Sequence, residues 1–312
     1  MISVIITSWK EPNTVGKCIQ CIADTSYSGI SKPFEILQVS PDEETLNAGK
    51  LVAKKLNLSE SEYIQIQDPK KGKPYALKLA LKKAKGDLIV FTDGDTYFEK
   101  DAVKYLLQPF ENENIYGVSG RPVSGDTKNN YMGYWGHLLS DAAHHRRSTL
   151  MSTKVDSYHV SKDTFFPMSG YIMATRRIEF GLPDNVLSDD AYISYSIRNM
   201  GKEIAYAPLA ICYVKYPTNL SDYYKQKVRS LGGFVQLKRF GVTKKDRQSR
   251  SFLIELKYAL FVFKYASNLK ELLWSILLFP VRFITWLMIF WDRVLLKKDM
   301  PKSGWERIES TK

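Results

Sequence analysis

The chain has 312 residues, 44% of them hydrophobic, and its 45 Lys and Arg outnumber its 33 Asp and Glu, giving a formal net charge of +12. This length and composition support a full hydrophobic core and exclude a disordered chain, a collagen and a small disulfide-stapled scaffold. The three cysteines are too few for a disulfide framework and fit a reducing compartment. The excess positive charge indicates an anionic partner, for which nucleic acid, a membrane surface and a phosphorylated ligand are the candidates.

Strand-like apolar runs alternate with amphipathic helical segments along the N-terminal third of the chain. The first run turns polar at Ser8, too early for a signal peptide, and no glycine-rich loop of a dinucleotide site or P-loop follows it. The alternation predicts an α/β fold with a mostly parallel sheet covered by helices. We expect strands at 1–7, 34–39, 63–67, 88–91, 115–120 and 171–174, and helices at 14–23, 43–56, 74–84, 131–146 and 189–200.

The strongest single motif is Asp93-Gly94-Asp95, directly after the apolar strand that ends near Phe91. Ligands of open α/β sheets sit at the carboxyl ends of the strands, and two carboxylates there suit a hard divalent cation that bridges phosphate oxygens. The motif therefore predicts Mg²⁺ or Mn²⁺ on a diphosphate. The alternative is an ordinary turn, because Asp and Gly are common turn residues.

Several motifs in a fixed order accompany this one. Together they make the chain resemble the family-2 glycosyltransferases of the GT-A fold over roughly its first three quarters. The resemblance implies a GT-A catalytic domain over 1–237, a nucleotide-sugar donor, expected to be a UDP-sugar, and inversion of the anomeric centre. The motifs are Ser3–Glu11, Gly72–Lys78, Asp93–Asp95, Ser169-Gly170, Ser188–Asp190 and Gln226–Arg229.

The resemblance also implies roles for individual residues on the donor side. Glu11 would contact the base or ribose, and Lys73 would lie near the nucleotide. Asp93 would help to seat the ribose and diphosphate, and Asp95 would bind the metal together with Asp93. Developing charge on the leaving diphosphate needs such cationic neighbours.

On the acceptor side, the resemblance assigns the catalytic base to Asp190, and Gln226 and Arg229 match the start of the Gln-x-x-Arg-Trp motif that closes the site. The chemistry agrees, because the acceptor hydroxyl must lose a proton to a carboxylate facing the sugar from the side opposite the leaving group. The alternative for Asp189 and Asp190 is the cap of a helix. We assign capping to Asp189 and catalysis to Asp190.

The chain departs from the family pattern at three places. The opening reads Thr7–Glu11 instead of Pro-x-Tyr-Asn-Glu, and Ser40-Pro41-Asp42 replaces the usual adjacent acids. Ser40 and Asp42 are candidates for contacting the nucleoside, with a surface turn as the alternative. Ser230 stands where processive synthases have tryptophan. This favours transfer of one sugar over chain polymerisation, with a processive polysaccharide synthase as the alternative.

Four cationic or titratable residues, His144–Arg147, follow one another in the expected helix 131–146 and just beyond it. They could contact phosphate or acceptor. Adjacent helical side chains point in different directions, so we expect a solvated face instead.

The last quarter is expected to form a membrane module: a basic connector at 238–250, apolar helices within 251–298 and a tail at 299–312. The segment 272–291 is long enough to span a bilayer but contains Pro280 and Arg282. A narrow polar stripe favours an interfacial or re-entrant position, with Lys and Arg at anionic headgroups, over a single crossing. The stripe comprises Lys257, Lys264, Asn268, Glu271, Ser275, Arg282 and Arg293.

These features predict a membrane-associated inverting glycosyltransferase. Its catalytic domain is expected on the cytoplasmic side, because basic clusters flank the apolar helices at both ends. The acceptor is expected to be lipid-linked or a glycan. A nucleotidyltransferase and a non-catalytic protein binding anionic lipid or nucleic acid are the rivals. Nucleic acid is not expected as a partner, because no nucleic-acid-binding motif is recognisable.

Overall fold

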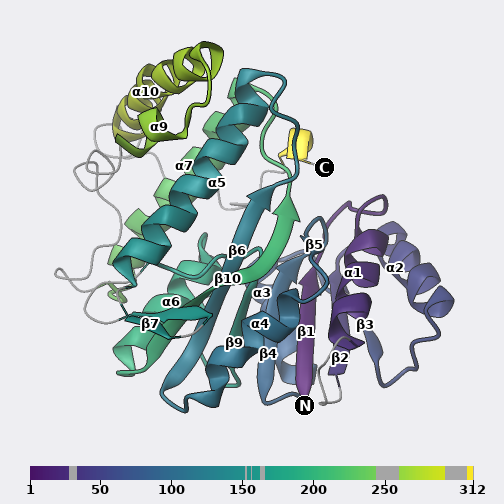
Figure 1. Ribbon diagram of the computed structural model, residues 1–312. Coiled ribbons are helices and arrows are strands. Elements are labelled where there is room, and N and C mark those ends of the chain that lie inside the picture. The colour runs from purple at the N-terminus through teal and green to yellow at the C-terminus, as the bar shows by residue number, and fades with distance from the viewer. Residues whose placement is uncertain are drawn as a thin grey trace.

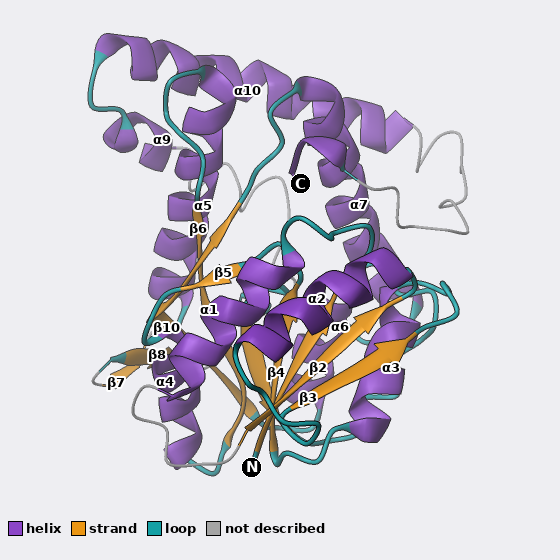
Figure 2. Cartoon of the chain, turned by 90° about the vertical axis from the view of Figure 1, so that its right-hand side faces the viewer, coloured by secondary structure: helices purple, strands orange, loops and turns teal. Residues whose placement is uncertain are grey.

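The computed structural model describes residues 1–27, 34–151, 153–155, 157–161, 166–243, 260–291 and 308–311. A ten-stranded sheet forms the base of the molecule, with helices on both faces, and a group of helices stands above one end of it (Figures 1 and 2). The strand order is β3-β2-β1-β4-β9-β6-β10-β8-β7, and β5 pairs with β10.

The first half of the chain follows the predicted alternation within a few residues. Its four strands pair in parallel, with Thr7 of β1 opposite both Val39 of β2 and Asp93 of β4. Every residue of β1 and β2 is buried, as expected for strands covered on both faces. The elements are β1 (Ile2–Thr7), α1 (Val15–Tyr27), β2 (Phe34–Ser40), α2 (Glu43–Lys55), β3 (Tyr63–Gln67), α3 (Lys73–Lys83) and β4 (Leu88–Asp93).

The second half makes the sheet mixed, which differs from the mostly parallel sheet expected. Strand β9 (Met173–Arg176) runs antiparallel between β4 and β6 (Ile115–Ser124), and β6 pairs in parallel with β10 (Glu203–Val214). Of the elements in this half of the chain, the sequence patterns predicted β6, β9, α5 and α6; they did not predict β5, α4, β7, β8, β10 or α7. The remaining elements are β5 (Tyr97–Phe98), α4 (Ala102–Leu107), a 3₁₀ turn (Gln108–Glu111), α5 (Tyr131–Leu150), β7 (Thr153–Val155), β8 (Tyr158–Val160), α6 (Asp189–Asn199) and α7 (Leu220–Arg239).

The C-terminal helices α9 (Leu260–Tyr265) and α10 (Leu269–Phe290) pack against α5 and α7, and α10 lies across the ends of both (Figure 2). Tyr134 and Ser275 share a hydrogen bond of 2.7 Å, and the indole of Trp135 donates to the carbonyl of Trp274 at 2.8 Å. A cluster of buried apolar residues fills this junction. Helix α7 ends at Arg239, close to the expected boundary at 237, and it contacts α10.

Helix α10 continues through Pro280, and its stretch Leu269–Met288 is long and apolar enough to cross a membrane, with only 17% of it buried. The described stripe residues do not share one environment: Ser275 is buried and Arg282 lines a cavity, whereas Lys264 and Asn268 are exposed. Most of the connector, residues 244–250, and the stripe residues Lys257 and Arg293 lie outside the described residues. The end of the tail, a 3₁₀ turn at Glu309–Thr311, bonds to the start of α7.

Candidate active site

The ends of β1 and β4 bring the first predicted site residues together. Thr7 donates a 2.9 Å hydrogen bond to Asp93 Oδ1, and the backbone N–H of Gly94 donates to the carbonyl of Thr7. A Cβ at position 94 would come within 2.5 Å of Glu11 Oε2, so the middle residue of the Asp-Gly-Asp motif must be glycine for the two segments to approach. Glu11 itself is buried.

Lys73, the first residue of α3, is the ionic centre of the site. Its Nζ lies 2.6 Å from Asp93 Oδ1 and 3.6 Å from Asp189 Oδ2, and its side chain is 11% exposed. Burial lowers the pKa of Lys73, but the carboxylates of Asp189 and Asp93 outweigh that effect and raise it above its usual value. Burial raises the pKa of Asp189 to about 6 against the opposing effect of Lys73. The lysine therefore holds two otherwise repelling acids together.

We expect Lys73→Met to lower the free energy of unfolding by about 3 kcal/mol, because it leaves two largely buried carboxylates without their cation. Lys78→Met is the matched control, since Lys78 lies on the same helix and pairs with Asp184, whose side chain is 64% exposed. That surface pair should contribute less than about 1 kcal/mol. Urea titration at pH 7 measures both, and equal losses would contradict the role given to Lys73.

The turn before α6 separates the two adjacent acids. Ser188 occupies the N-cap position, and Asp189 directs its carboxylate to Lys73, so the capping role expected for Asp189 is wrong. Asp190 accepts hydrogen bonds from the backbone N–H of Gly170 at 3.2 Å and of Ala191 at 2.7 Å. These two amides hold the Asp190 carboxylate in one orientation.

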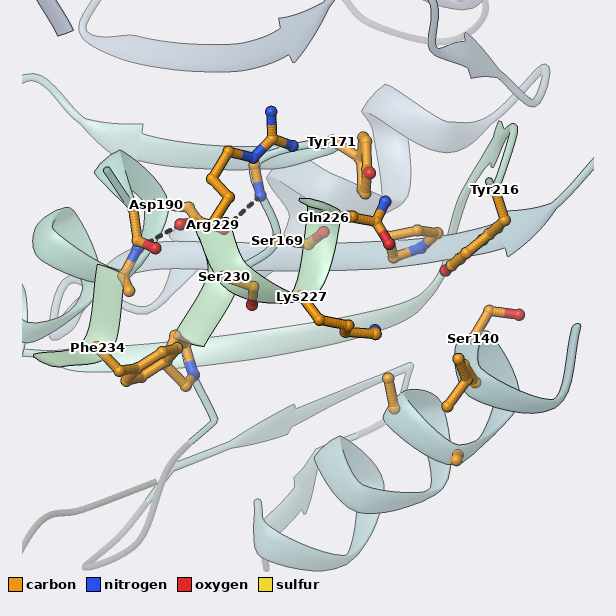
Figure 3. A pocket seen from close by; sticks show the side chains of 18 of the residues that line it. Ser140, Ser169, Tyr171, Asp190, Tyr216, Gln226, Lys227, Arg229, Ser230 and Phe234 are labelled. Carbon is orange, nitrogen blue, oxygen red and sulfur yellow. Dashed lines mark hydrogen bonds between the residues drawn. The ribbon is translucent and has the colours of Figure 1, made fainter. Parts of the chain in front are cut away.

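Helix α7 is fastened to the same turn. Gln236 accepts from the N–H of Leu187 at 2.8 Å and donates to the carbonyl of Asn185 at 2.7 Å. Gly233 lies against Ser188 so closely that a side chain would not fit there. This docking brings Arg229 and Gln226, about one and two turns before Gly233 on α7, to the same cavity as Asp190 (Figure 3).

That cavity has a volume of about 740 Å³ and runs from the acids to α10. Of the predicted site residues, it is lined by Lys73, Asp93, Asp190, Gln226 and Arg229. Figure 3 shows Lys227, Ser230 and Phe234 of α7 lining it as well. Elements β4, α3, α6 and α7 thus bring sequence motifs that are far apart in the chain to one cavity.

Glu11, Ser40, Asp42 and Asp95 lie at the neighbouring strand ends and do not line this cavity. Asp42 caps α2 by accepting from Thr45 N at 2.9 Å, and it also accepts from Ser40 Oγ at 3.0 Å. Burial raises the pKa of Asp42, but these hydrogen bonds outweigh it and hold the pKa below its usual value. Ser40 and Asp42 therefore build the turn, which was the alternative considered for them.

The acids at the strand ends provide a donor set for a hard cation. Burial raises the pKa of the Cys18 thiol, and the charges of Asp95, Glu11 and Asp93 raise it further, so these three carboxylates lie around one point. The described residues contain no group of three or more His, Cys, Asp or Glu that would form a metal site alone. Mg²⁺ is usually bound by one or two carboxylates, with phosphate oxygens and water as the remaining ligands. Asp93 and Asp95 therefore fit this metal.

Sequence reasoning missed the arginines of α5. Arg146 and Arg147 are only 8% and 6% exposed and both line the cavity, whereas a solvated face was expected. The expectation failed because α5 is covered on several sides, by β6 and β10 and by α9 and α10. The apolar residues that follow in 260–291 were the available signal that another layer would cover this helix.

Comparison with known proteins decides the family. The family described as "Glycosyltransferase like family 2" matches residues 1–233. The chain belongs to glycosyltransferase family 2. This assignment favours glycosyl transfer over the nucleotidyl transfer and non-catalytic binding considered above, and the enzyme is a glycosyltransferase.

Curated relatives of this glycosyltransferase are distant. It is 24% identical over 262 residues to the poly-β-1,6-N-acetyl-D-glucosamine synthase of Staphylococcus aureus, covering 81% of this chain and 60% of the relative. It is 24% identical over 252 residues to an N-acetylglucosaminyltransferase of Azorhizobium caulinodans, covering 73% and 58%. The chain thus spans about three fifths of the length of these relatives.

Among solved structures, a mannosyltransferase from Pyrobaculum calidifontis in complex with GDP-mannose and Mn²⁺ aligns with a TM-score of 0.62 at 16% identity. The alignment covers 96% of this chain and 88% of the other. The predicted GT-A fold is confirmed by this likeness, which extends over nearly the whole chain.

Proposed function

We propose that this glycosyltransferase moves one sugar from a nucleotide-sugar donor to an acceptor hydroxyl with inversion, using Asp190 as the base. The cavity carries the proposal, because it joins Lys73 and Asp93 on one element pair to Asp190 and Arg229 on another. A donor diphosphate at the strand ends would leave its sugar facing Asp190. The catalytic roles of Gln226 and Arg229 are part of the same proposal.

In the proposed transfer, each charged residue of the site has its own role. Asp190, fixed by the N–H groups of Gly170 and Ala191, accepts the proton of the attacking hydroxyl. Arg229 faces the cavity and stabilises negative charge that develops on the leaving diphosphate. Asp95 and Asp93 would hold Mg²⁺ or Mn²⁺, which neutralises diphosphate charge when bound. Lys73 pairs with Asp93 and Asp189 and holds both carboxylates in place.

The donor is proposed to be a UDP-sugar, and N-acetylglucosamine is the first sugar to test because both curated relatives are named for it. Transfer of a single sugar is favoured by Ser230, which gives the cavity a small polar side chain where a processive synthase has tryptophan. The relative from Staphylococcus aureus is a polymer synthase. A processive reaction is therefore the second candidate, and the length of the product separates the two.

We propose a membrane surface as the location of the reaction, with the catalytic domain on the cytoplasmic side and a lipid-linked or glycan acceptor. The support is the outer face of α10, where large apolar side chains stand exposed to an extent unusual for a soluble surface. They include Leu269, Leu273, Ile276, Leu277, Phe283, Ile284, Leu287, Met288 and Phe290.

We expect the double substitution Leu277→Glu and Ile284→Glu on that face to abolish flotation of the full chain with vesicles containing anionic lipid, because each carboxylate would have to enter the acyl region. Both side chains are about half exposed, 46% and 53%, so folding should be preserved. Leu51→Glu, at a 63% exposed position on α2, is the control and should float like the unchanged protein. Flotation of the double variant would exclude α10 as the attachment surface.

A panel of nucleotide sugars tests the proposed activity. The membrane fraction or purified full chain is incubated with each donor and Mn²⁺, and the released nucleoside diphosphate is measured. Turnover of one UDP-sugar, lost on chelation of the metal, is the expected result. Release of pyrophosphate, or turnover of no donor, would contradict the proposal.

A further inference from the structure

Helix α7 carries Gln226 and Arg229, so the placement of its first turns decides where these two side chains lie. The later part of the helix is docked by Gln236, which bonds to the backbone of the turn before α6 at 2.7 and 2.8 Å. That contact is about two turns from Arg229 and about three turns from Gln226. The beginning of the helix is held by other contacts.

The connection from β10 to α7, residues 215–219, is held by side chains from two other parts of the chain. Tyr216 N donates to Asp126 Oδ2 at 2.9 Å. Thr218 N donates to Ser310 Oγ at 3.2 Å. Asp126 follows β6, whereas Ser310 lies beyond α10, in the 3₁₀ turn Glu309–Thr311. A segment far along the sequence therefore takes part in holding the start of α7.

Ser310 makes a second contact, with α7 itself. Its backbone N–H donates to Asp222 Oδ2 at 3.1 Å, and Asp222 lies in the first turn of the helix. The hydroxyl and the N–H of Ser310 hold the pKa of Asp222 below its usual value and outweigh the opposing effect of burial. Hydrogen bonds to an ionised group are among the stronger ones in proteins. Ser310 thus bridges the connection before α7 and the first turn of α7.

The turn that carries Ser310 is packed into the protein. The side chains on either side of it are buried, because Ile308 is 5% exposed and Thr311 is 9% exposed. Thr311 Oγ1 donates to the carbonyl of Ile308 at 2.9 Å, which closes the turn. The two contacts of Ser310 with the start of α7 therefore come from a fixed segment.

The helix carries the position of Asp222 to the cavity. Gln226 follows Asp222 by four residues, so it lies on the same face of α7, about 6 Å further along the axis. Arg229 lies about one turn beyond. Backbone hydrogen bonds join these turns, and a shift of the first turn moves both side chains. Ser310 is not among the described residues that line the cavity, so it acts on them through α7.

We propose that Ser310 is a positioning residue of this glycosyltransferase: it holds the start of α7, through Thr218 and Asp222, so that Gln226 and Arg229 keep their places in the cavity. The inference rests on the proposed function, which gives those two residues their roles in transfer. Misplacing a group that stabilises the transition state slows the chemical step far more than it weakens binding of the donor.

Hydrogen–deuterium exchange of the full chain tests the attachment without any turnover. Ser310→Ala should speed exchange of the backbone amides of residues 216–229 about 3- to 10-fold, the effect of losing about one hydrogen bond. Ile308→Ala, which loosens the same turn by removing a buried side chain, should speed exchange in the same region at least as much. Exchange in α3 should stay unchanged in both variants.

Two further variants serve as controls for the exchange. Ser310→Thr keeps the hydroxyl and should exchange like the unchanged protein. Ser221→Ala removes an exposed hydroxyl from the residue beside Asp222 and should have no effect. Unchanged exchange at 216–229 in both Ser310→Ala and Ile308→Ala would overturn the proposal, and so would an equal increase throughout the chain, which would indicate general loss of stability.

Steady-state transfer measures the positioning role itself, with the UDP-sugar that the donor panel identifies. Ser310→Ala should lower kcat about 10-fold and leave KM for the donor and calorimetric affinity for UDP with Mn²⁺ unchanged, and Ser310→Thr should restore kcat. Faster exchange at 216–229 with an unchanged kcat would show that Ser310 only packs the tail, which contradicts positioning.

The two measurements separate this inference from the function on which it rests. If the unchanged protein turns over no nucleotide sugar, the proposed function fails, and the exchange alone then decides whether Ser310 holds the start of α7. If the unchanged protein is active and Ser310→Ala keeps both its kcat and its exchange pattern, the proposed function stands and the role of Ser310 is disproved.

Discussion

Asp190→Asn should lower kcat for sugar transfer by about 1,000-fold or more while the affinity for UDP in the presence of Mn²⁺ stays the same. The amide cannot accept the proton of the attacking hydroxyl, but it occupies the same space on α6. The two ion pairs at the donor side are left intact, because Lys73 makes them with Asp93 and Asp189. Single-turnover transfer and calorimetric binding of UDP measure the two quantities separately.

Two controls make this result specific to Asp190. Its carboxylate accepts from both Gly170 N and Ala191 N, so the amide nitrogen of the variant must face one of these donors, and the melting temperature has to be recorded beside kcat. Asp184→Asn, in the exposed loop before α6, should retain full activity. A folded Asp190→Asn enzyme with undiminished kcat would disprove the assignment of the base.

The N-terminal half of the fold was predictable because its signals are local. Fully buried strands read as apolar runs, and the alternation with helices requires that they be parallel. Since the ends of parallel strands align, Thr7 and Asp93 had to meet at one edge, as their pairing shows. The prediction of Asp190, Gln226 and Arg229 as site residues rested instead on the order of the motifs. No local sequence pattern shows that α6 and α7 lie near β4.

What the sequence could not predict depends on packing between distant segments. Strand β10 was not expected; its sequence contains Pro208, and its pairing with β6, β8 and β5 is made by residues far apart in the chain. The sequence favoured a capping role for Asp189. It could not show that Lys73 Nζ lies 3.6 Å from the Asp189 carboxylate. Arg147 could be assigned to solvent only as long as α9 and α10 were treated as a separate module. In each case a long-range contact overrides the local preference.

Asp95→Asn should remove the metal-dependent part of nucleotide affinity. In the unchanged protein, Mn²⁺ is expected to tighten UDP binding strongly, because the cation would be held between the diphosphate and the carboxylates at the end of β4. Loss of one charged ligand should weaken UDP binding in Mn²⁺ by at least about 10-fold, and binding in chelator should be unchanged. Asp95, Glu11 and Asp93 all contribute to the raised pKa of Cys18 after burial, so three carboxylates lie around this location, which supports it as the place of the cation.

The matched control lies at the other end of the same strand. Asp87 precedes β4, pairs with the N-terminal amine at 3.2 Å and is 87% exposed, so Asp87→Asn removes an equal charge far from the predicted metal. Its UDP affinity should respond to Mn²⁺ like that of the unchanged protein. If Asp95→Asn did the same, the metal would have to be held elsewhere. If both variants lost the response equally, net charge and not coordination by Asp95 would explain the metal dependence.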